Sequence, residues 1–218
     1  MTDLDGDSVP NTVYTKKLEA RRNSPEVQSF KERVNTFLRD VGASEELVYR
    51  LRCDLSKKID MPFYGEPKVR PGNMSLSVVE IAKEYVLLLI RYGDEAFSEE
   101  LLSWLTKQQG QTFRRIHRLS QKQKERKRKI KSGVYEHPVP VNYSKLKLLE
   151  YIEKKNADNA LRYIEYMSAN IPQVFLTTEE DSLVNRISKD SMPEGWNWET
   201  DSPFERYIRA GIPEDVYK

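Results

Sequence analysis

The residues best suited to a specific chemistry are basic and lie together in residues 114–131, RRIHRLSQKQKERKRKIK. This segment holds ten Lys/Arg and one acid, Glu125, so it carries +9, and the rest of the 218-residue chain carries −7 of the formal total of +2. Lys and Arg bind phosphate oxygens and displace the counterions of a nucleic acid. Because ten like charges repel one another, we expect this segment to bind a polyanion, and nucleic acid first. The alternatives are an acidic protein surface, the chain's own acidic tail, or a solvated helix face.

Residues for catalysis or metal binding are few. One cysteine, Cys53, and two histidines cannot build a Cys₄ or Cys₂His₂ zinc site. The glycine-rich nucleotide-binding motifs and the GxSxG motif of hydrolases do not occur. The adjacent acids, such as Glu99-Glu100, stand at expected helix starts, where carboxylates complement the helix dipole. We therefore expect no enzymatic activity, no catalytic residue, no metal site and no cofactor.

Composition bears on the compartment. The chain is polar, with 38% hydrophobic and 32% charged residues. It holds no apolar run of the roughly 18 residues that a membrane span needs, and its acidic N-terminus does not resemble a secretory signal. We expect a cytoplasmic protein with no membrane partner, or a nuclear one if the run at 124–131 serves as an import signal in a eukaryotic or viral setting.

The elements before the basic segment have a recognisable order in residues 85–119, YVLLLIRYGDEAFSEELLSWLTKQQGQTFRRIHRL. A hydrophobic helix precedes a short amphipathic helix, and a turn at Gly110 leads to a helix with Phe113, Ile116 and Leu119 on its inward face. This order resembles the helix–turn–helix of bacterial and phage transcription regulators, including winged-helix types. The resemblance implies that the last helix enters the major groove of duplex DNA. The alternative is a helical hairpin that packs on a partner protein.

If those three apolar residues face inward, the polar residues between them face outward. There, an arginine can form paired hydrogen bonds with guanine, and a glutamine can do so with adenine. The following extension, QKQKERKRKIK, either prolongs the recognition helix across a phosphate backbone or forms a loose arm. The predicted nucleic-acid-binding residues are Gln111, Thr112, Arg114, Arg115, Arg118, Lys122, Lys124, Arg126, Lys127, Arg128, Lys129 and Lys131.

The sequence predicts a mainly α fold, a helical bundle with a helix–turn–helix-like central unit and an irregular acidic C-terminal tail. The expected order is a flexible segment at 1–23, a helical hairpin at 24–60, a linker or loop at 61–75, the helix–turn–helix-like domain with its basic helix at 76–132, an extended connection at 133–143, a second helical hairpin at 144–171 and the tail at 172–218.

Local signals predict where several helices start: Ser24 followed by Pro25, Ser75 or Ser77 with Glu80 completing a capping box after Ser77, and Asn156 or Asp158. The stretch VVEIAKEYVLLLIRY is the most apolar of the chain and is expected to form the central core helix.

The second half carries two further expectations. Ser144 is expected to cap the first helix of the second hairpin, with Leu146, Leu149 and Ile152 at core spacing. Residues 176–218 hold ten acids against five bases and include Trp196 and Trp198. Because large aromatic side chains are costly to leave in water, this tail either folds back or docks on a partner or a second copy through 190–218. One hypothesis is that the tail covers the basic helix.

Together these features favour a nucleic-acid-binding protein, with duplex DNA ahead of RNA, in transcription control, replication or packaging in a bacterium, phage or virus. The alternative is a helical structural or assembly subunit, viral or nucleoprotein-like, whose basic helix binds an acidic protein or RNA. Either protein could form a homo-oligomer.

Overall fold

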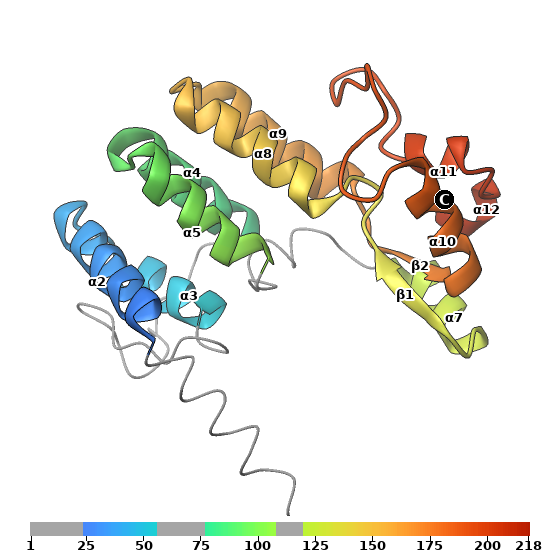
Figure 1. Ribbon diagram of the computed structural model, residues 1–218, viewed down its shortest axis with the longest axis horizontal. Helices are drawn as coiled ribbons and strands as arrows, with labels where there is room; N and C mark the ends of the chain where they lie inside the picture. Colours follow the sequence, from blue (N-terminus) through green and yellow to red (C-terminus); the bar gives the residue numbers. More distant parts are fainter. Residues whose placement is uncertain (1–23, 56–76, 108–119) are drawn as a thin grey trace, which may run out of the picture. The chain divides into compact units, whose positions relative to one another are not determined.

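The computed structural model describes residues 24–55, 77–107 and 120–218. The chain is mainly helical, as the sequence predicts, and its strands in the described part form one two-stranded sheet (Figure 1). It divides into two compact units between Gly72 and Asn73, inside the segment expected to be a linker or loop.

The first unit contains α2 (Pro25–Asp40) and α3 (Glu45–Leu55). The Ser24 hydroxyl accepts a hydrogen bond from the Val27 amide, and Pro25 fills the first helical position, as the sequence predicts. Apolar side chains at three- and four-residue steps are buried on each helix. These are Val27, Phe30, Val34 and Leu38 on α2, with Leu47, Val48 and Leu51 on α3.

The second unit begins with α4 (Val78–Tyr92) and α5 (Glu95–Lys107). Ser77 and Glu80 form the predicted capping box at the start of α4, and the Asp94 carboxylate accepts a hydrogen bond from the Phe97 amide at the start of α5. The buried face of α4 is the apolar stretch that the sequence predicts to be central: Ile81, Ala82, Tyr85, Val86, Leu89 and Ile90.

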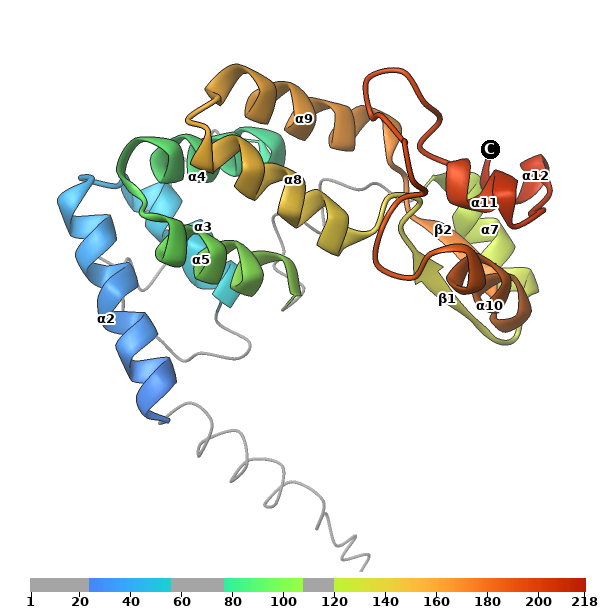
Figure 2. The ribbon, with the colours of Figure 1, turned by 45° about the horizontal axis from the view of Figure 1, so that its top comes forward.

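A second helical hairpin, α8 (Val141–Glu153) and α9 (Ala157–Asn170), packs on these helices, α8 against α5 and α9 against α4 (Figures 1 and 2). Asn156 caps α9 as predicted, but α8 begins three residues before Ser144. Ser144 is instead buried and accepts a hydrogen bond from the Tyr163 hydroxyl. The core prediction is also corrected, since Leu146 is 53% exposed while Leu148 is buried.

Two short strands, β1 (Gly133–Glu136) and β2 (Val174–Thr177), pair antiparallel with Tyr135 opposite Phe175. The expected extended connection at 133–143 is therefore a strand followed by the start of α8. The partner of β1 lies about 40 residues further along the chain and across a helical hairpin, so the strand is not part of a local wing hairpin.

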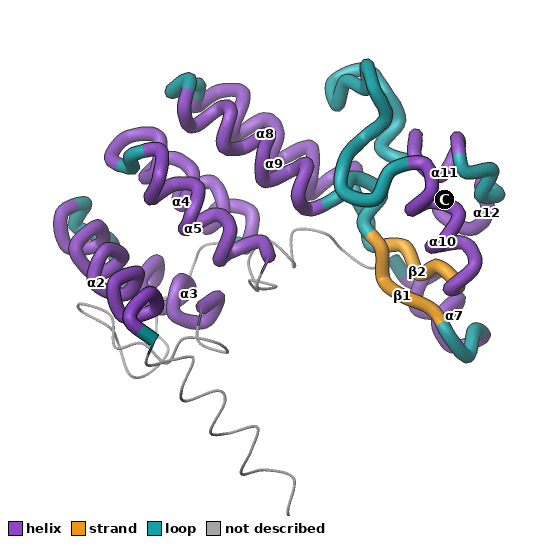
Figure 3. The backbone as a smooth tube through the Cα atoms, in the orientation of Figure 1, coloured by secondary structure: helices purple, strands orange, loops and turns teal. Residues whose placement is uncertain are grey.

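The C-terminal segment folds back on the second unit, one of the two arrangements expected, and it is more regular than the expected tail. It contributes β2, α10 (Thr178–Ile187), α11 (Glu205–Arg209) and α12 (Glu214–Tyr217) to the second unit, with a long loop between α10 and α11 (Figure 3). Trp196 and Trp198 lie in that loop and are each 8% exposed; the Trp198 indole donates a hydrogen bond to the Tyr151 hydroxyl on α8. A core under the sheet joins these elements: Val174, Leu176, Val184, Tyr207, Ile212, Val216 and Tyr217.

Candidate nucleic-acid interface

The described part of the basic segment forms a separate helix, α7 (Gln121–Lys129), with sequence QKQKERKRK. Ser120 has an extended backbone, and its hydroxyl accepts a hydrogen bond from the Gln123 amide, so α7 starts at its own cap. The helix is therefore neither a continuation of a preceding helix through Ser120 nor a loose arm. Four basic residues fill its last turn, where cations complement the helix dipole.

No apolar residue occurs in α7, which carries six Lys/Arg and one acid. A nine-residue helix of this composition would be unstable alone, because its charges repel and it has no apolar face to bury. Its position must therefore come from polar contacts with the rest of the second unit.

Gln123 supplies the first of those contacts. Its side chain is buried, only 2% exposed, and both ends of its amide are used. Oε1 accepts a hydrogen bond of 2.8 Å from the Phe175 amide on β2, and Nε2 donates one of 2.7 Å to the carbonyl of Val216 on α12. One glutamine thus joins the basic helix to the sheet and to the C-terminal helix.

Arg126, one turn later, supplies the second contact. Its Nε donates to the Phe175 carbonyl at 2.8 Å, and its Nη2 reaches both carboxylate oxygens of Glu180 on α10, at 2.7 and 2.6 Å. Lys127 lies beside it with its ammonium 4.7 Å from the centre of the Tyr135 ring, within the range of a cation–π contact. These side chains fix both the position of α7 and its rotation about its own axis.

The two anchors cover a strand edge. The Phe175 amide donates a hydrogen bond to Gln123, and the Phe175 carbonyl accepts one from Arg126. Side chains of α7 therefore occupy the positions that a third strand would take beside β2. An uncovered strand edge would otherwise offer those groups to another chain. The basic helix is thereby held as part of the fold.

The opposite face of α7 consists of exposed side chains. At about 100° per residue, Gln121, Lys122, Lys124, Glu125, Arg128 and Lys129 fall on an arc of roughly 160° that points away from the anchors. Five cations are exposed on this face and in the segment just after it, and none of them has an ion-pair partner among the described residues: Lys122, Lys124, Arg128, Lys129 and Lys131. We call these five side chains the basic face.

The structure sorts the predicted binding residues into three groups. The five residues of the basic face are exposed and close together on one element. Arg126 and Lys127 face the sheet and anchor the helix, so Arg126 in particular is occupied by Glu180. The remaining five lie outside the described residues, together with the expected recognition helix: Gln111, Thr112, Arg114, Arg115 and Arg118.

The acidic C-terminal segment packs against α7 from the side opposite the basic face. Its carboxylates pair mainly with other bases, Glu199 with Arg162 and Glu214 with Lys218, while Glu180 pairs with the inward Arg126. Among the described residues, no carboxylate of this segment pairs with the basic face. The C-terminal segment therefore covers the inward side of the basic helix, through Val216 and Glu180, and leaves the basic face uncovered.

A buried ion pair holds the C-terminal elements together behind the sheet. The Arg206 side chain is 0% exposed; it donates to a carboxylate oxygen of Glu136 at 3.1 Å and to the Ser188 carbonyl at 2.8 Å. Burial raises the pKa of Glu136 above its ordinary value, and the neighbouring Arg206 charge offsets part of that rise. The Arg206 side chain is fully covered, whereas the Glu136 side chain remains 22% exposed.

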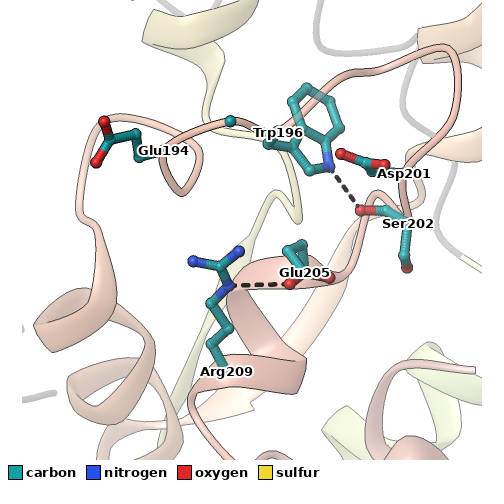
Figure 4. Close-up of a pocket in the computed structure, with 7 residues that line it drawn as sticks. Glu194, Trp196, Asp201, Ser202, Glu205 and Arg209 are labelled. Carbon is teal, nitrogen blue, oxygen red and sulfur yellow. Dashed lines mark hydrogen bonds and ion pairs between the residues drawn. The ribbon is translucent and has the colours of Figure 1, made fainter.

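A small pocket of about 290 Å³ lies in the loop before α11 and on α11 itself (Figure 4). Trp196 closes part of it and donates a hydrogen bond to the Ser202 carbonyl, while Arg209 pairs with Glu205 at 2.9 Å. Among its polar side chains only Glu205 and Arg209 pair with each other, and its lining contains no histidine or cysteine. Throughout the described ranges, no group of three or more His, Cys, Asp or Glu side chains is placed to hold a metal ion.

Sequence reasoning missed the residues that position the basic face, Gln123, Phe175 and Glu180. A glutamine in a run of lysines has no distinguishing feature, because hydrophobic periodicity detects apolar faces and α7 has none. The one available signal was the Thr177–Glu180 capping-box spacing, which marks the start of α10 but not the pairing of Glu180 with Arg126.

In the parts of the chain that the structure describes, no helix has the length and apolar character needed to cross a membrane. Comparison of the chain with known protein families, with curated proteins and with solved structures found no match in any of the three.

Proposed function

We propose that this protein binds nucleic acid through the basic face of α7, with duplex DNA as the favoured ligand, in transcription control, replication or packaging. The observation that carries the proposal is the exposed cluster of five cations without ion-pair partners in the described structure, on a helix whose other face is fixed by Gln123 and Arg126. A preformed array of this kind suits a regularly spaced polyanion, because little ordering cost is paid on binding.

Duplex is favoured over single strands because the aromatic side chains near α7 are not presented for base stacking. Phe175 is 5% exposed and packs edge-on against Tyr135 at 5.2 Å, and Tyr135 also lies beneath Lys127. Proteins that bind single strands place exposed aromatic rings along a basic groove. Among the described residues, the surroundings of the basic face hold positive charges but no aromatic ring exposed in this way.

Fluorescence anisotropy with labelled duplex DNA, single-stranded DNA and duplex RNA, from 50 to 200 mM salt, tests the proposal. We expect duplex DNA to bind most tightly. The double variant Lys124→Gln/Lys129→Gln should lower the magnitude of the salt slope by about 1.8, since each lost phosphate contact on duplex DNA removes about 0.9.

The control is Lys154→Gln/Lys189→Gln, which removes the same charge from exposed sites just after α8, where Lys154 pairs with Glu150, and just after α10. It should leave the slope within about 0.5 of that of the unmodified protein. Equal effects of the two double variants, or the absence of binding to any nucleic acid at 50 mM salt, would refute the proposal. Binding to an acidic protein without binding to nucleic acid would favour the assembly subunit instead.

A further inference from the structure

We infer that α7 contacts the phosphate backbone and does not read bases. This inference rests on the proposed function and specifies how the same surface would work. In this respect α7 differs from a recognition helix, whose outward side chains must reach base edges in a groove.

Two of the α7 side chains that suit base recognition, Gln123 and Arg126, are turned towards the protein. A glutamine recognises adenine through both ends of its amide, and an arginine recognises guanine through its paired N–H groups. Both ends of the Gln123 amide are bonded to the protein backbone, and Arg126 is bonded to Phe175 and Glu180. Releasing either one for a base would leave buried backbone groups or a carboxylate unpaired.

The outward side chains suit phosphates. The amide of Gln121, the other glutamine of α7, donates to a carboxylate oxygen of Glu125 at 3.1 Å. Four of the five cations of the basic face are lysines, which act as point charges on phosphates. Arg128 is the one arginine among them, and so it is the side chain with which the inference can be tested most sharply.

The length of the array also fits a short run of phosphates. From Lys122 to Lys129 the helix rises about 10 Å, which equals about three phosphate steps of one strand along a duplex axis. The outward arc therefore spans about four phosphates of one strand and places four cations and Glu125 along them.

Glu125 lies within the outward arc, between the cations. A carboxylate there repels any phosphate bound along the arc, so it weakens the attraction without altering the fold. If phosphates lie along this arc, Glu125→Gln tightens binding, whereas Glu153→Gln, the same charge change at the far end of α8, does not.

The test uses the full chain and three variants, Glu125→Gln, Glu153→Gln and Arg128→Lys, each measured on a set of duplexes of equal length and different sequence at one salt concentration. We expect Glu125→Gln to tighten binding by about two- to fivefold on every duplex, and Glu153→Gln and Arg128→Lys to stay within about twofold of the unmodified protein. Circular dichroism confirms that each variant keeps its helix content.

A loss of more than about tenfold for Arg128→Lys that is confined to guanine-containing duplexes would show that α7 reads bases and would overturn the inference while leaving the proposed function standing. Equal affinities for Glu125→Gln and Glu153→Gln would place the phosphates elsewhere and overturn it as well. If the unmodified protein binds no duplex, the proposed function itself fails.

Discussion

Gln123 is the residue on which the position of α7 depends most, and replacing it with alanine is the sharpest structural test. The substitution removes an acceptor 2.8 Å from the Phe175 amide and a donor 2.7 Å from the Val216 carbonyl. Both backbone groups lie beside a side chain that is only 2% exposed, so water does not simply replace the lost partner.

The size of the effect follows from those two bonds. A buried polar group that loses its partner costs about 1–3 kcal/mol, and two are affected at once. Some relaxation and entry of water will recover part of that cost, so we expect the free energy of unfolding of the second unit to fall by about 2–4 kcal/mol.

Urea denaturation followed by tryptophan fluorescence measures this loss, because Trp196 and Trp198 report on the second unit. Hydrogen exchange of the peptides covering α7 and β2 locates it, since the Phe175 amide should lose protection. The matched control is Gln121→Ala on the exposed face, which should change stability by less than about 0.5 kcal/mol.

A Gln123→Ala protein as stable as the Gln121→Ala protein, with the Phe175 amide still protected, would refute the reasoning. It would mean that α7 is held by something other than the two amide bonds, and the rotation that exposes the basic face would lose its explanation.

Three further predictions concern the same unit. Glu180→Gln should lower stability by about 1–2 kcal/mol in urea denaturation, because it removes the charge paired with Arg126 while keeping an oxygen for the Thr177 amide; an unchanged midpoint would contradict this. Gly133→Ala should cost about 1–3 kcal/mol, since a Cβ there would lie 2.2 Å from the Leu176 carbonyl oxygen, and the midpoint of urea denaturation again measures it. Burial raises the pKa of Glu136, so the folded protein holds this proton to higher pH than the unfolded chain does, and stability should fall as pH rises from the ordinary carboxyl pKa through the raised one. The difference in stability between the unmodified protein and Glu136→Gln, followed by thermal denaturation against pH, should show that fall, and a difference that rises or stays flat would contradict it.

Local signals in the sequence predicted the helix starts well. Ser24, Ser77 and Asn156 cap helices as expected, because a cap depends on hydrogen bonds within three residues of the chain. The exception is α8, where Pro140 precedes the first helical residue and the backbone becomes helical before Ser144. The predicted core position Leu146 lies two residues, about 200° of helical rotation, before the buried Leu148 and so falls on the exposed side of the helix.

Contacts between distant segments were not predictable in the same way. The four-residue strand β1 pairs with a strand that follows a helical hairpin, so no tight-turn sequence between the two strands predicts their pairing. The burial of Trp198 depends on Tyr151, which lies 47 positions away. The sequence indicated that the tryptophan side chains must be buried, but it did not indicate which surface they pack against.

The sequence predicted the positive charge of α7 but not which side of the helix faces the protein. Composition alone located the basic helix and most of its exposed cations. Which side of an entirely polar helix faces inward depends on partners far along the chain, Phe175, Glu180 and Val216. The distinction between anchoring and binding residues, Arg126 against Arg128, therefore required the structure.

Lysine footprinting of the complex with duplex DNA tests the central claim most directly. Amine modification read out by mass spectrometry reports the exposure of each lysine with and without saturating duplex. We predict that Lys122, Lys124 and Lys129 become protected while Lys154 and Lys189, exposed elsewhere in the second unit, keep their reactivity. If the three lysines of α7 stayed as reactive as Lys154 and Lys189 in a saturated complex, the basic face would not be the site of binding.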